Sequence, residues 1–504
     1  MTEGNSYRQI LRSSSIIGGA SVVNILVGLL RMKVVAVLLG PSGLGLIGLL
    51  QNLMTTVSKT ASLGFGTVGT RQVAKAVGRG DPVAVAAARR ALFWGSLGLA
   101  ALGALATWLL REVLARVVLG DAGMAGEVGW LSLGVALAVG SGSQRALLNG
   151  MRRMGDLARI SVGSALLATI GGVGAIAWLG EDGVLAFVLV SPLAGFLLGH
   201  LYVARIPRNR GPRTPFRALL SQWAVLARLG VAFMLAGLTP TLGQLAVRTL
   251  IQRELGPEAL GHFEAAWMIS MTYIGFVLGA MGTDYYPRLS AVIQDSATAN
   301  RLVNEQTEVA LLLAGPVLVV MLGFAPVVIQ LLFSSQFGDS VAVLRWQVFG
   351  DVLKVVSWPL GFIMLATGDG RHFVFAEATA MAVFVGATWV GLPLIGIQAT
   401  GVAFVSLYVV YLPIVYWFAA RRTGLVWRKG LLKQLFLLMA GCTAICAAAL
   451  WSEWAARGLS LALATVLGLH GVSRLGTKAE LGGRLGRVSL KLREAMRKFG
   501  MKDP

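Results

Sequence analysis

The sequence predicts an all-α polytopic membrane protein: two pseudo-symmetric six-helix bundles around a central cleft, followed by two extra C-terminal spans. Three observations support this fold class. Of 504 residues, 56% are hydrophobic and only 13% charged, with a mean hydropathy of +0.73, which one soluble core cannot accommodate. The apolar segments are mostly about 18 to 25 residues long, which fits membrane helices better than barrel strands. The pattern L-G-P-x-x-L-G occurs twice, at 39–45 and 255–261.

The two copies of this pattern lie 216 positions apart, and each lies between two long apolar runs. In both copies the following run ends in Gly-Thr, at Gly66-Thr67 and at Gly282-Thr283. Later glycines repeat at a similar offset, Gly150 with Gly368 and Gly183 with Gly401. A period this long indicates a duplicated lobe of about six helices rather than a solenoid.

Hydropathy predicts about fourteen membrane spans. We expect them near residues 13–36, 44–66, 91–110, 128–148, 160–179, 184–204, 219–250, 262–282, 309–333, 345–366, 373–393, 399–419, 432–451 and 458–473. The predicted domains are an N-terminal six-helix lobe (1–210), a C-terminal six-helix lobe (211–422), two appended transmembrane helices (423–475) and a basic cytoplasmic tail (476–504). The tail is expected to be either an amphipathic helix on the membrane surface or disordered.

Basic residues are concentrated in alternate loops, as the positive-inside rule requires of cytoplasmic loops. The clusters lie at 71–90, 152–159, 205–217 and 421–433 and beyond residue 474. This distribution predicts cytoplasmic termini. The formal charge of +21 then reflects topology and attraction to anionic membrane lipids, and it requires no nucleic-acid partner. Two cysteines four residues apart in one apolar helix predict neither a disulfide framework nor a metal site.

Several basic residues fall well inside apolar segments, where a charge is costly unless it faces a watery cavity or an acid. Two of them, Arg31 and Arg248, occupy nearly matching places in the two lobes. We expect this set to line a cationic cleft that binds an anionic head group, because guanidinium groups match phosphate oxygens. Structural ion pairing is the alternative. The set comprises Arg31, Lys33, Lys59, Arg145, Arg248 and Lys354.

Carboxylates and amides in or near the spans provide further candidates. A carboxylate in a span can exchange a proton or a sodium ion as a cavity switches sides, and the candidates for ion coupling are Glu264, Asp284, Asp351 and Glu377. For Asp351 the alternative is an ion pair with Lys354 on the same helix. Amides can bind sugar hydroxyls or hold helices together, and the candidates for sugar contact are Gln51, Asn52, Gln144, Asn149 and Gln244.

Three stretches resemble bacterial polysaccharide flippases of the O-antigen (Wzx) type, within the multidrug and oligosaccharidyl-lipid exporter superfamily. They are residues 40–45 with the apolar run to Gly66, residues 148–153, and residues 284–290. The resemblance covers about residues 8–420. It implies transport of an undecaprenyl-pyrophosphate-linked oligosaccharide to the periplasmic leaflet of the bacterial inner membrane, by alternating access between two bundles. A polysaccharide polymerase or a chain-length regulator is a candidate partner, and the sequence itself does not show whether transport needs one.

Other function classes fit the sequence less well. A multidrug or organic-cation antiporter of the same superfamily needs a mainly acidic and aromatic cleft, whereas these charges are cationic. A membrane glycosyltransferase, polymerase or ligase needs grouped carboxylates or a metal in a sizeable loop. No G-x-x-x-x-G-K-[ST] motif occurs, so direct ATP hydrolysis is not expected. No cofactor is expected either. The sequence therefore predicts a transporter driven by a proton or sodium gradient.

Overall fold

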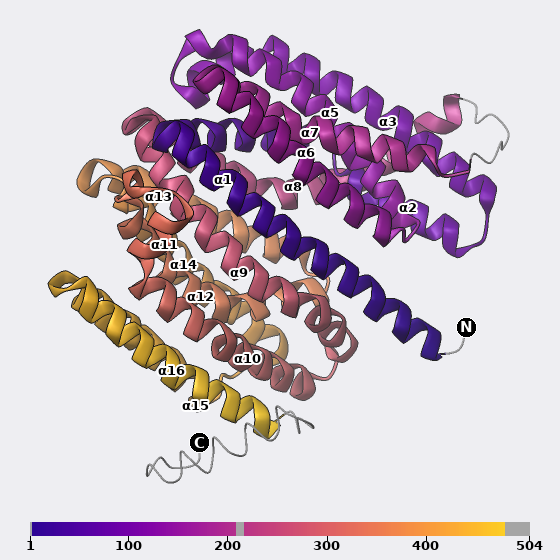
Figure 1. Cartoon of the computed structure of the whole chain (residues 1–504). Coiled ribbons are helices and arrows are strands. Elements are labelled where there is room, and N and C mark those ends of the chain that lie inside the picture. Colours follow the sequence, from indigo (N-terminus) through magenta and orange to yellow (C-terminus); the bar gives the residue numbers. More distant parts are fainter. Residues whose placement is uncertain (1–2, 208–215, 479–504) are drawn as a thin grey trace. The chain divides into compact units, whose positions relative to one another are not determined.

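All regular structure in the protein is helical in the residues that its computed structural model describes, 3–207 and 216–478 (Figure 1). Within them, ten helical stretches are long and apolar enough to cross a membrane. The bent pair Gly256–Gly279 and Asp284–Val292 would make an eleventh. The predicted class, an all-α multi-pass membrane protein, is therefore confirmed.

Sixteen α-helices form the described part of the chain. They are α1 (Glu3–Ala61), α2 (Phe65–Gly78), α3 (Pro82–Leu109), α4 (Arg111–Leu114), α5 (Ala125–Gly150), α6 (Met154–Leu179), α7 (Gly183–Ala204), α8 (Phe216–Glu254), α9 (Gly256–Val292), α10 (Ser296–Gly323), α11 (Ala325–Leu332), α12 (Ser340–Ala366), α13 (Gly370–Ile395), α14 (Gln398–Thr423), α15 (Lys429–Trp451) and α16 (Glu453–Lys478).

Packing divides the chain into two compact units. The first comprises Met1–Glu264 together with Leu332–Phe337, and the second comprises Ala265–Leu331 together with Gly338–Pro504. The predicted domain boundaries at residues 210, 422 and 475 follow the sequence repeat and composition rather than packing, and they stay predictions. The predicted tail, beyond residue 478, and most of the linker, 208–215, lie outside the described residues.

In the first unit, α3 packs along α5, and α6 packs along α7. A core that includes Phe65, Leu92, Leu148 and Ile160 joins α2, α3, α5 and α6. Helix α1 is kinked at Gly40, whose φ of 64° and ψ of −164° lie outside the helical range. The next residue is a proline without an N–H group, so the helical hydrogen bonding is interrupted at this point.

In the second unit, α12 packs against both α10 and α14. Its buried residues Val348, Val352 and Val355 belong to the same core as Leu318 of α10 and Cys442 of α15. The appended helix α16, yellow in Figure 1, also packs on α10. There the Ser460 hydroxyl donates to the Val319 carbonyl at 2.9 Å. The helices beyond residue 423 are thus integrated into the core of the second unit.

The sequence duplication is visible in the backbone. Both L-G-P copies have a glycine with positive φ directly before the proline, 64° at Gly40 and 86° at Gly256. Helices α6 and α13 both end at a glycine of nearly the same conformation, Gly180 (60°, −130°) and Gly396 (59°, −144°), which are 216 positions apart. Positive φ favours glycine, so the repeat preserves residues that the turns require.

Two of the ten apolar stretches contain two predicted spans each. Ile16–Ala61 has 46 residues and Met154–Ala204 has 51, whereas about 20 residues suffice to cross a bilayer. Each stretch is interrupted at a glycine with positive φ, Gly40 in the first and Gly180 in the second. The exact number of crossings, the two six-helix bundles and the cytoplasmic termini stay predictions.

Candidate functional site

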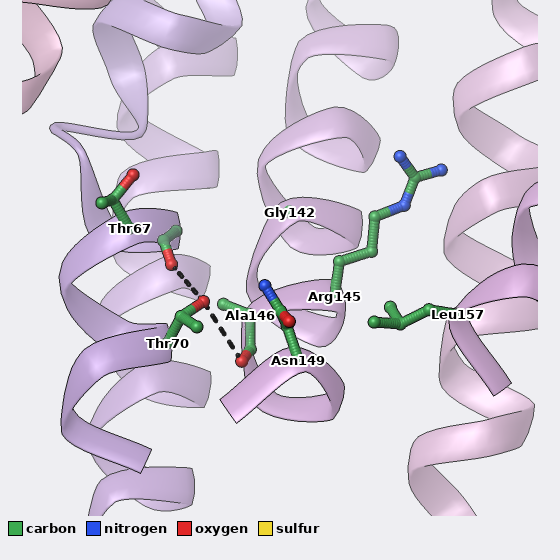
Figure 2. A pocket seen from close by; sticks show the side chains of 8 residues that line it. Thr67, Thr70, Gly142, Arg145, Ala146, Asn149 and Leu157 are labelled. Carbon is green, nitrogen blue, oxygen red and sulfur yellow. Dashed lines mark hydrogen bonds between the residues drawn. The ribbon is translucent and has the colours of Figure 1, made fainter. Parts of the chain in front are cut away.

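A pocket of about 390 Å³ opens in the first unit between α2, α5 and α6 (Figure 2). It lies beside a break in the helical backbone, because α1 ends at Ala61 and α2 begins at Phe65. Leu63 and Gly64 both have positive φ there, 46° and 69°. A side chain on Gly64 would collide with the Gly230 backbone, so α8 packs closely against this break. The break ends one helix and starts another at the edge of the pocket.

The lining of the pocket combines small and apolar residues with two threonines, one asparagine and one arginine. It consists of Gly66, Thr67, Thr70, Gly142, Arg145, Ala146, Asn149 and Leu157. Figure 2 shows Arg145 and Asn149 on α5, between α2 with its two threonines and α6 with Leu157. The Thr70 hydroxyl donates to the Gly66 carbonyl at 2.8 Å and lies 3.4 Å from the Ala146 carbonyl, so it links α2 to α5.

Arg145 is the charged group of this pocket. It is an exposed side chain, and among the described residues its guanidinium makes no hydrogen bond or ion pair. The carboxylate next to the lining, that of Asp156, is paired with Arg153 at 3.0 Å and with Arg159 at 3.5 Å. The pocket therefore presents an uncompensated cation together with the Thr67 hydroxyl and the Asn149 amide. These groups suit an anion with several oxygen atoms.

Two other predicted cations of the first unit are only partly satisfied. The Arg31 guanidinium lies 5.4 Å from the centre of the Phe187 ring, and its buried Nε has no hydrogen-bond partner among the described residues. Lys59 is exposed and donates to the Thr241 hydroxyl at 2.7 Å. Both groups can still offer a charge to a ligand, Arg31 beside an aromatic face and Lys59 at an exposed position.

Arg248 and Glu264 form a buried, bidentate ion pair. Arg248 Nε lies 2.5 Å from Glu264 Oε1, and Nη2 lies 3.1 Å from Oε2. Only 5% and 8% of the two side chains are exposed. The carboxylate also packs on Gly48, where a side chain would collide with it. In this conformation the two charges satisfy one another.

Two predicted lysines are engaged by the protein itself. Lys33 donates to the backbone carbonyl of Phe333, within the first unit. In the second unit, Lys354 Nζ lies 3.2 Å from the Met271 sulfur and 6.0 Å from the centre of the Phe404 ring. The sequence therefore located these charges, but it could not predict the groups that they contact.

The carboxylates of the second unit differ in burial. Asp351 is fully buried and accepts hydrogen bonds from the Ser270 hydroxyl at 2.7 Å and from the Tyr273 hydroxyl. Its Oδ1 has no hydrogen-bond partner among the described residues. Glu377 is half-buried and accepts from the Tyr411 hydroxyl at 2.9 Å.

Asp284 has a different environment. It forms a 3.0 Å ion pair with Arg288, one helical turn away, and 72% of its side chain is exposed. Such exposed pairs contribute little to stability, about 0 to 1 kcal/mol. Of the four predicted coupling groups, Asp351 and Glu377 are therefore the two whose hydrogen bonds come from hydroxyl groups instead of a cation.

The predicted amides are spread over several helices of the first unit. Asn149 lines the pocket, and Gln144 packs against Gly199 of α7. Asn52 and Gln144 each have a buried side-chain oxygen without a partner among the described residues. Gln51 is half-buried on α1, and the backbone carbonyl of Gln244 accepts from Arg248 at 3.3 Å. Of these amides, only Asn149 lines the pocket with a predicted cation.

Sequence reasoning missed Thr67 and Thr70 as part of the site. In the sequence, Gly66-Thr67 stands out only as a marker of the repeat, because a hydroxyl in an apolar helix carries no charge signal. Ser270 and Tyr411, which bind the carboxylates of the second unit, were missed for the same reason. The helical break before Gly66 is the feature that could have directed attention to these threonines.

Residues 34–342 match the protein family described as "Polysaccharide biosynthesis protein". A lipid III flippase of Escherichia coli (strain K12) is 25% identical over 413 residues, which cover 78% of this chain and 94% of that protein. Together with the fold, these matches confirm the predicted resemblance to polysaccharide flippases.

Two solved structures share the fold. The lipid II flippase MurJ, in an inward closed conformation, aligns with a TM-score of 0.71 at 9% identity and covers 92% of this chain and 99% of that chain. An inward-facing multidrug resistance MATE family transporter of the MOP superfamily has a TM-score of 0.68 at 19% identity and covers 80% and 94% of the two chains. At these identities the likeness concerns the fold alone.

Proposed function

Since the chain belongs to the polysaccharide biosynthesis protein family, we propose that it is a flippase for a lipid-linked oligosaccharide. The substrate would be an undecaprenyl-pyrophosphate-linked repeat unit of a surface polysaccharide, moved from the cytoplasmic to the periplasmic leaflet of the bacterial inner membrane. The relative called lipid III flippase and the fold shared with MurJ support this proposal. About fourteen crossings, two six-helix bundles and cytoplasmic termini complete the proposed architecture.

The observation that carries the proposal is Arg145 in its polar pocket. A charge inside a membrane helix costs at least a few kcal/mol, so it is expected to have a partner or a function. Among the described residues the partner is missing, and the surroundings are hydroxyl and amide donors. A diphosphate or an acidic sugar would supply the oxygen atoms that this guanidinium lacks. Arg31 and Lys59 are the further proposed anion contacts, and Asn149 is the proposed sugar contact.

We propose that ion coupling involves Asp351 and Glu377. The estimated cost of an uncompensated buried charge is several kcal/mol, and Asp351 has an unpartnered oxygen at full burial. Binding of a proton or a sodium ion there would remove that cost. Lys354 lies on α12 with Asp351, and its single positive charge is shared between the carboxylates of Asp351 and Glu377. Transport in vesicles that survives collapse of both the proton and the sodium gradient would refute this coupling.

The second candidate function is an organic-cation antiporter, because a MATE transporter shares the fold. An organic cation is bound by ion pairing with carboxylates or by cation–π contact with aromatic faces. The pocket around Arg145 has neither among its lining residues. The flippase is therefore the better proposal, and a transporter fits better than a membrane glycosyltransferase.

Export of surface polysaccharide tests this function. In a strain deleted for the gene, the wild-type protein should restore the polysaccharide, and lipid-linked sugar should no longer accumulate. Arg145→Gln should fail to restore it at normal protein levels, whereas Arg145→Lys should retain part of the activity. The matched control is Arg79→Gln, an exposed arginine beyond the end of α2. Full export by Arg145→Gln would contradict the proposed role of the pocket.

A further inference from the structure

The two L-G-P turns contact one another reciprocally. A Cβ placed on Gly261 would overlap the Pro41 carbonyl group and lie 2.8 Å from the Pro41 Cα. A Cβ placed on Gly45 would likewise overlap the Pro257 carbonyl oxygen and lie 2.7 Å from the Gly261 nitrogen. Because 41 and 45 correspond to 257 and 261 in the repeat, this is one contact made twice, as in a local two-fold interface. We call it the turn clasp.

The turn clasp depends on the absence of side chains. Real Cβ atoms do not approach other atoms so closely, so alanine at either glycine would push the two turns apart. Leu44 and Leu260, next to the touching glycines, are fully buried. Deeper in the unit, Gly48 packs on the Glu264 carboxylate in the same manner. The two turns therefore touch through their backbones, with buried leucines beside the contact.

A third segment, Leu332–Phe337, contacts both turns and is here called the latch. It begins at the last residue of α11, yet it packs within the first unit. The Gln336 side chain lies 3.0 Å from where a Cβ of Gly40 would be, in the first turn. The Phe337 ring is fully buried, 5.9 Å from the ring of His262, which follows the second turn. The latch therefore joins the two copies of the repeat.

Lys33 fixes the latch to α1. Its ammonium group donates to the Phe333 carbonyl, 300 positions along the chain. Hydrogen bonds of charged groups are stronger than neutral ones, yet they can be exchanged for bonds to water. A lysine at this place can therefore hold the latch firmly and still release it. In this conformation the Lys33 ammonium group is hydrogen-bonded to the latch.

We propose that the turn clasp and the latch form a closed gate, that Lys33 is its positioning residue, and that the gate opens to release the substrate. The proposal rests on the proposed flippase function. The distribution of basic residues predicts that both turns face the periplasm, where the oligosaccharide leaves. The two repeat halves must separate there, and the contacts of Pro41 with Gly261 and of Pro257 with Gly45 are the ones that break.

The distance between the two turns tests the gate directly. Spin labels are placed on Ser42→Cys and Glu258→Cys, both exposed, in a background with the two native cysteines replaced by alanine. Pulsed electron resonance in lipid vesicles should show a short distance in the parent. Lys33→Met should shift the ratio of closed to open states roughly tenfold or more toward the long distance, the effect of losing one charge-assisted hydrogen bond.

Three variants control this measurement. Lys33→Arg retains a donor and should keep the short distance, and Lys75→Met removes an exposed lysine elsewhere and should leave the distances unchanged. Gln336→Ala, at the exposed end of the latch, should move the distribution in the same direction as Lys33→Met. Identical distributions in the parent and in both latch variants would overturn the proposal.

A reducible cross-linker between the same two cysteines tests the link to transport. Closing the clasp should lower the flipping rate at least tenfold, and reduction should restore it. Full flipping by the cross-linked protein would overturn the gate. If neither the wild type nor the double-cysteine variant without cross-linker flips the lipid, the flippase function is refuted. The spin-label distances would still decide whether the turns and the latch open.

Discussion

The buried pair of Arg248 and Glu264 allows a quantitative prediction. Replacing Arg248 by methionine removes two hydrogen bonds, at 2.5 and 3.1 Å, from a carboxylate that is only 8% exposed. Breaking a buried ion pair on one side costs about 3–5 kcal/mol, because the remaining charge stays buried without compensation. We expect that loss of unfolding free energy for Arg248→Met, and a comparable loss for Glu264→Met.

The double variant should be more stable than either single one. Two apolar side chains of similar length remove both charges, and such replacements of buried pairs are often neutral or stabilising. The coupling energy of the cycle should therefore be at least about 2 kcal/mol, well above the additive limit of about 0.5 kcal/mol. Unfolding by titration of mixed micelles with a denaturing detergent, followed by tryptophan fluorescence, measures it. Single variants as stable as the wild type, or strictly additive losses, would refute the reasoning.

Two further predictions concern stability. Gly48→Ala should lower the unfolding free energy by about 1–3 kcal/mol, because the new Cβ would lie 2.7 Å from Glu264 Cγ. The control Gly275→Ala has open space around it and should be neutral or slightly stabilising in the same titration. The hydroxyl and the backbone N–H of Thr298 lower the pKa of Asp295, the N-cap of α10, because they stabilise its charged form. The ionised Asp295 side chain therefore contributes its full stabilisation of the folded state above the ordinary carboxyl pKa of about 3.9. That stabilisation is lost as the pH falls through the lowered pKa. The advantage of the wild type over Asp295→Ala in melting temperature should accordingly disappear in acid, and an advantage that grows in acid would contradict this assignment.

The membrane class and the duplication could be predicted from the sequence, because both depend on local properties. Hydropathy indicates whether a segment lies in lipid or in water. The repeated glycines indicate backbone conformations that other residues adopt only under strain. Gly40 and Gly256 illustrate this, since the same turn chemistry recurs with positive φ at both places. Such constraints act within a few residues and are readable in one sequence.

The partners of the charges could not be predicted, because packing brings together residues from distant helices. Lys33 reaches a carbonyl 300 positions away, and that acceptor belongs to the backbone, which has no sequence signal. Arg145 was predicted, but its pocket also needs Thr67 and Thr70, which the break at Gly64 places beside α5. Sequence therefore identifies charges that need an explanation, and the fold decides which of them remain uncompensated.

Flipping by the purified protein tests the central claim most directly. The protein is reconstituted into vesicles with a labelled, diphosphate-linked prenyl oligosaccharide, and a membrane-impermeant enzyme or quencher reports the labelled fraction in the outer leaflet. The account predicts that wild-type protein moves the lipid between leaflets far faster than protein-free vesicles do, and that Arg145→Gln loses this activity while remaining folded. Flipping at the protein-free rate by the wild type, or at the wild-type rate by Arg145→Gln, would contradict it.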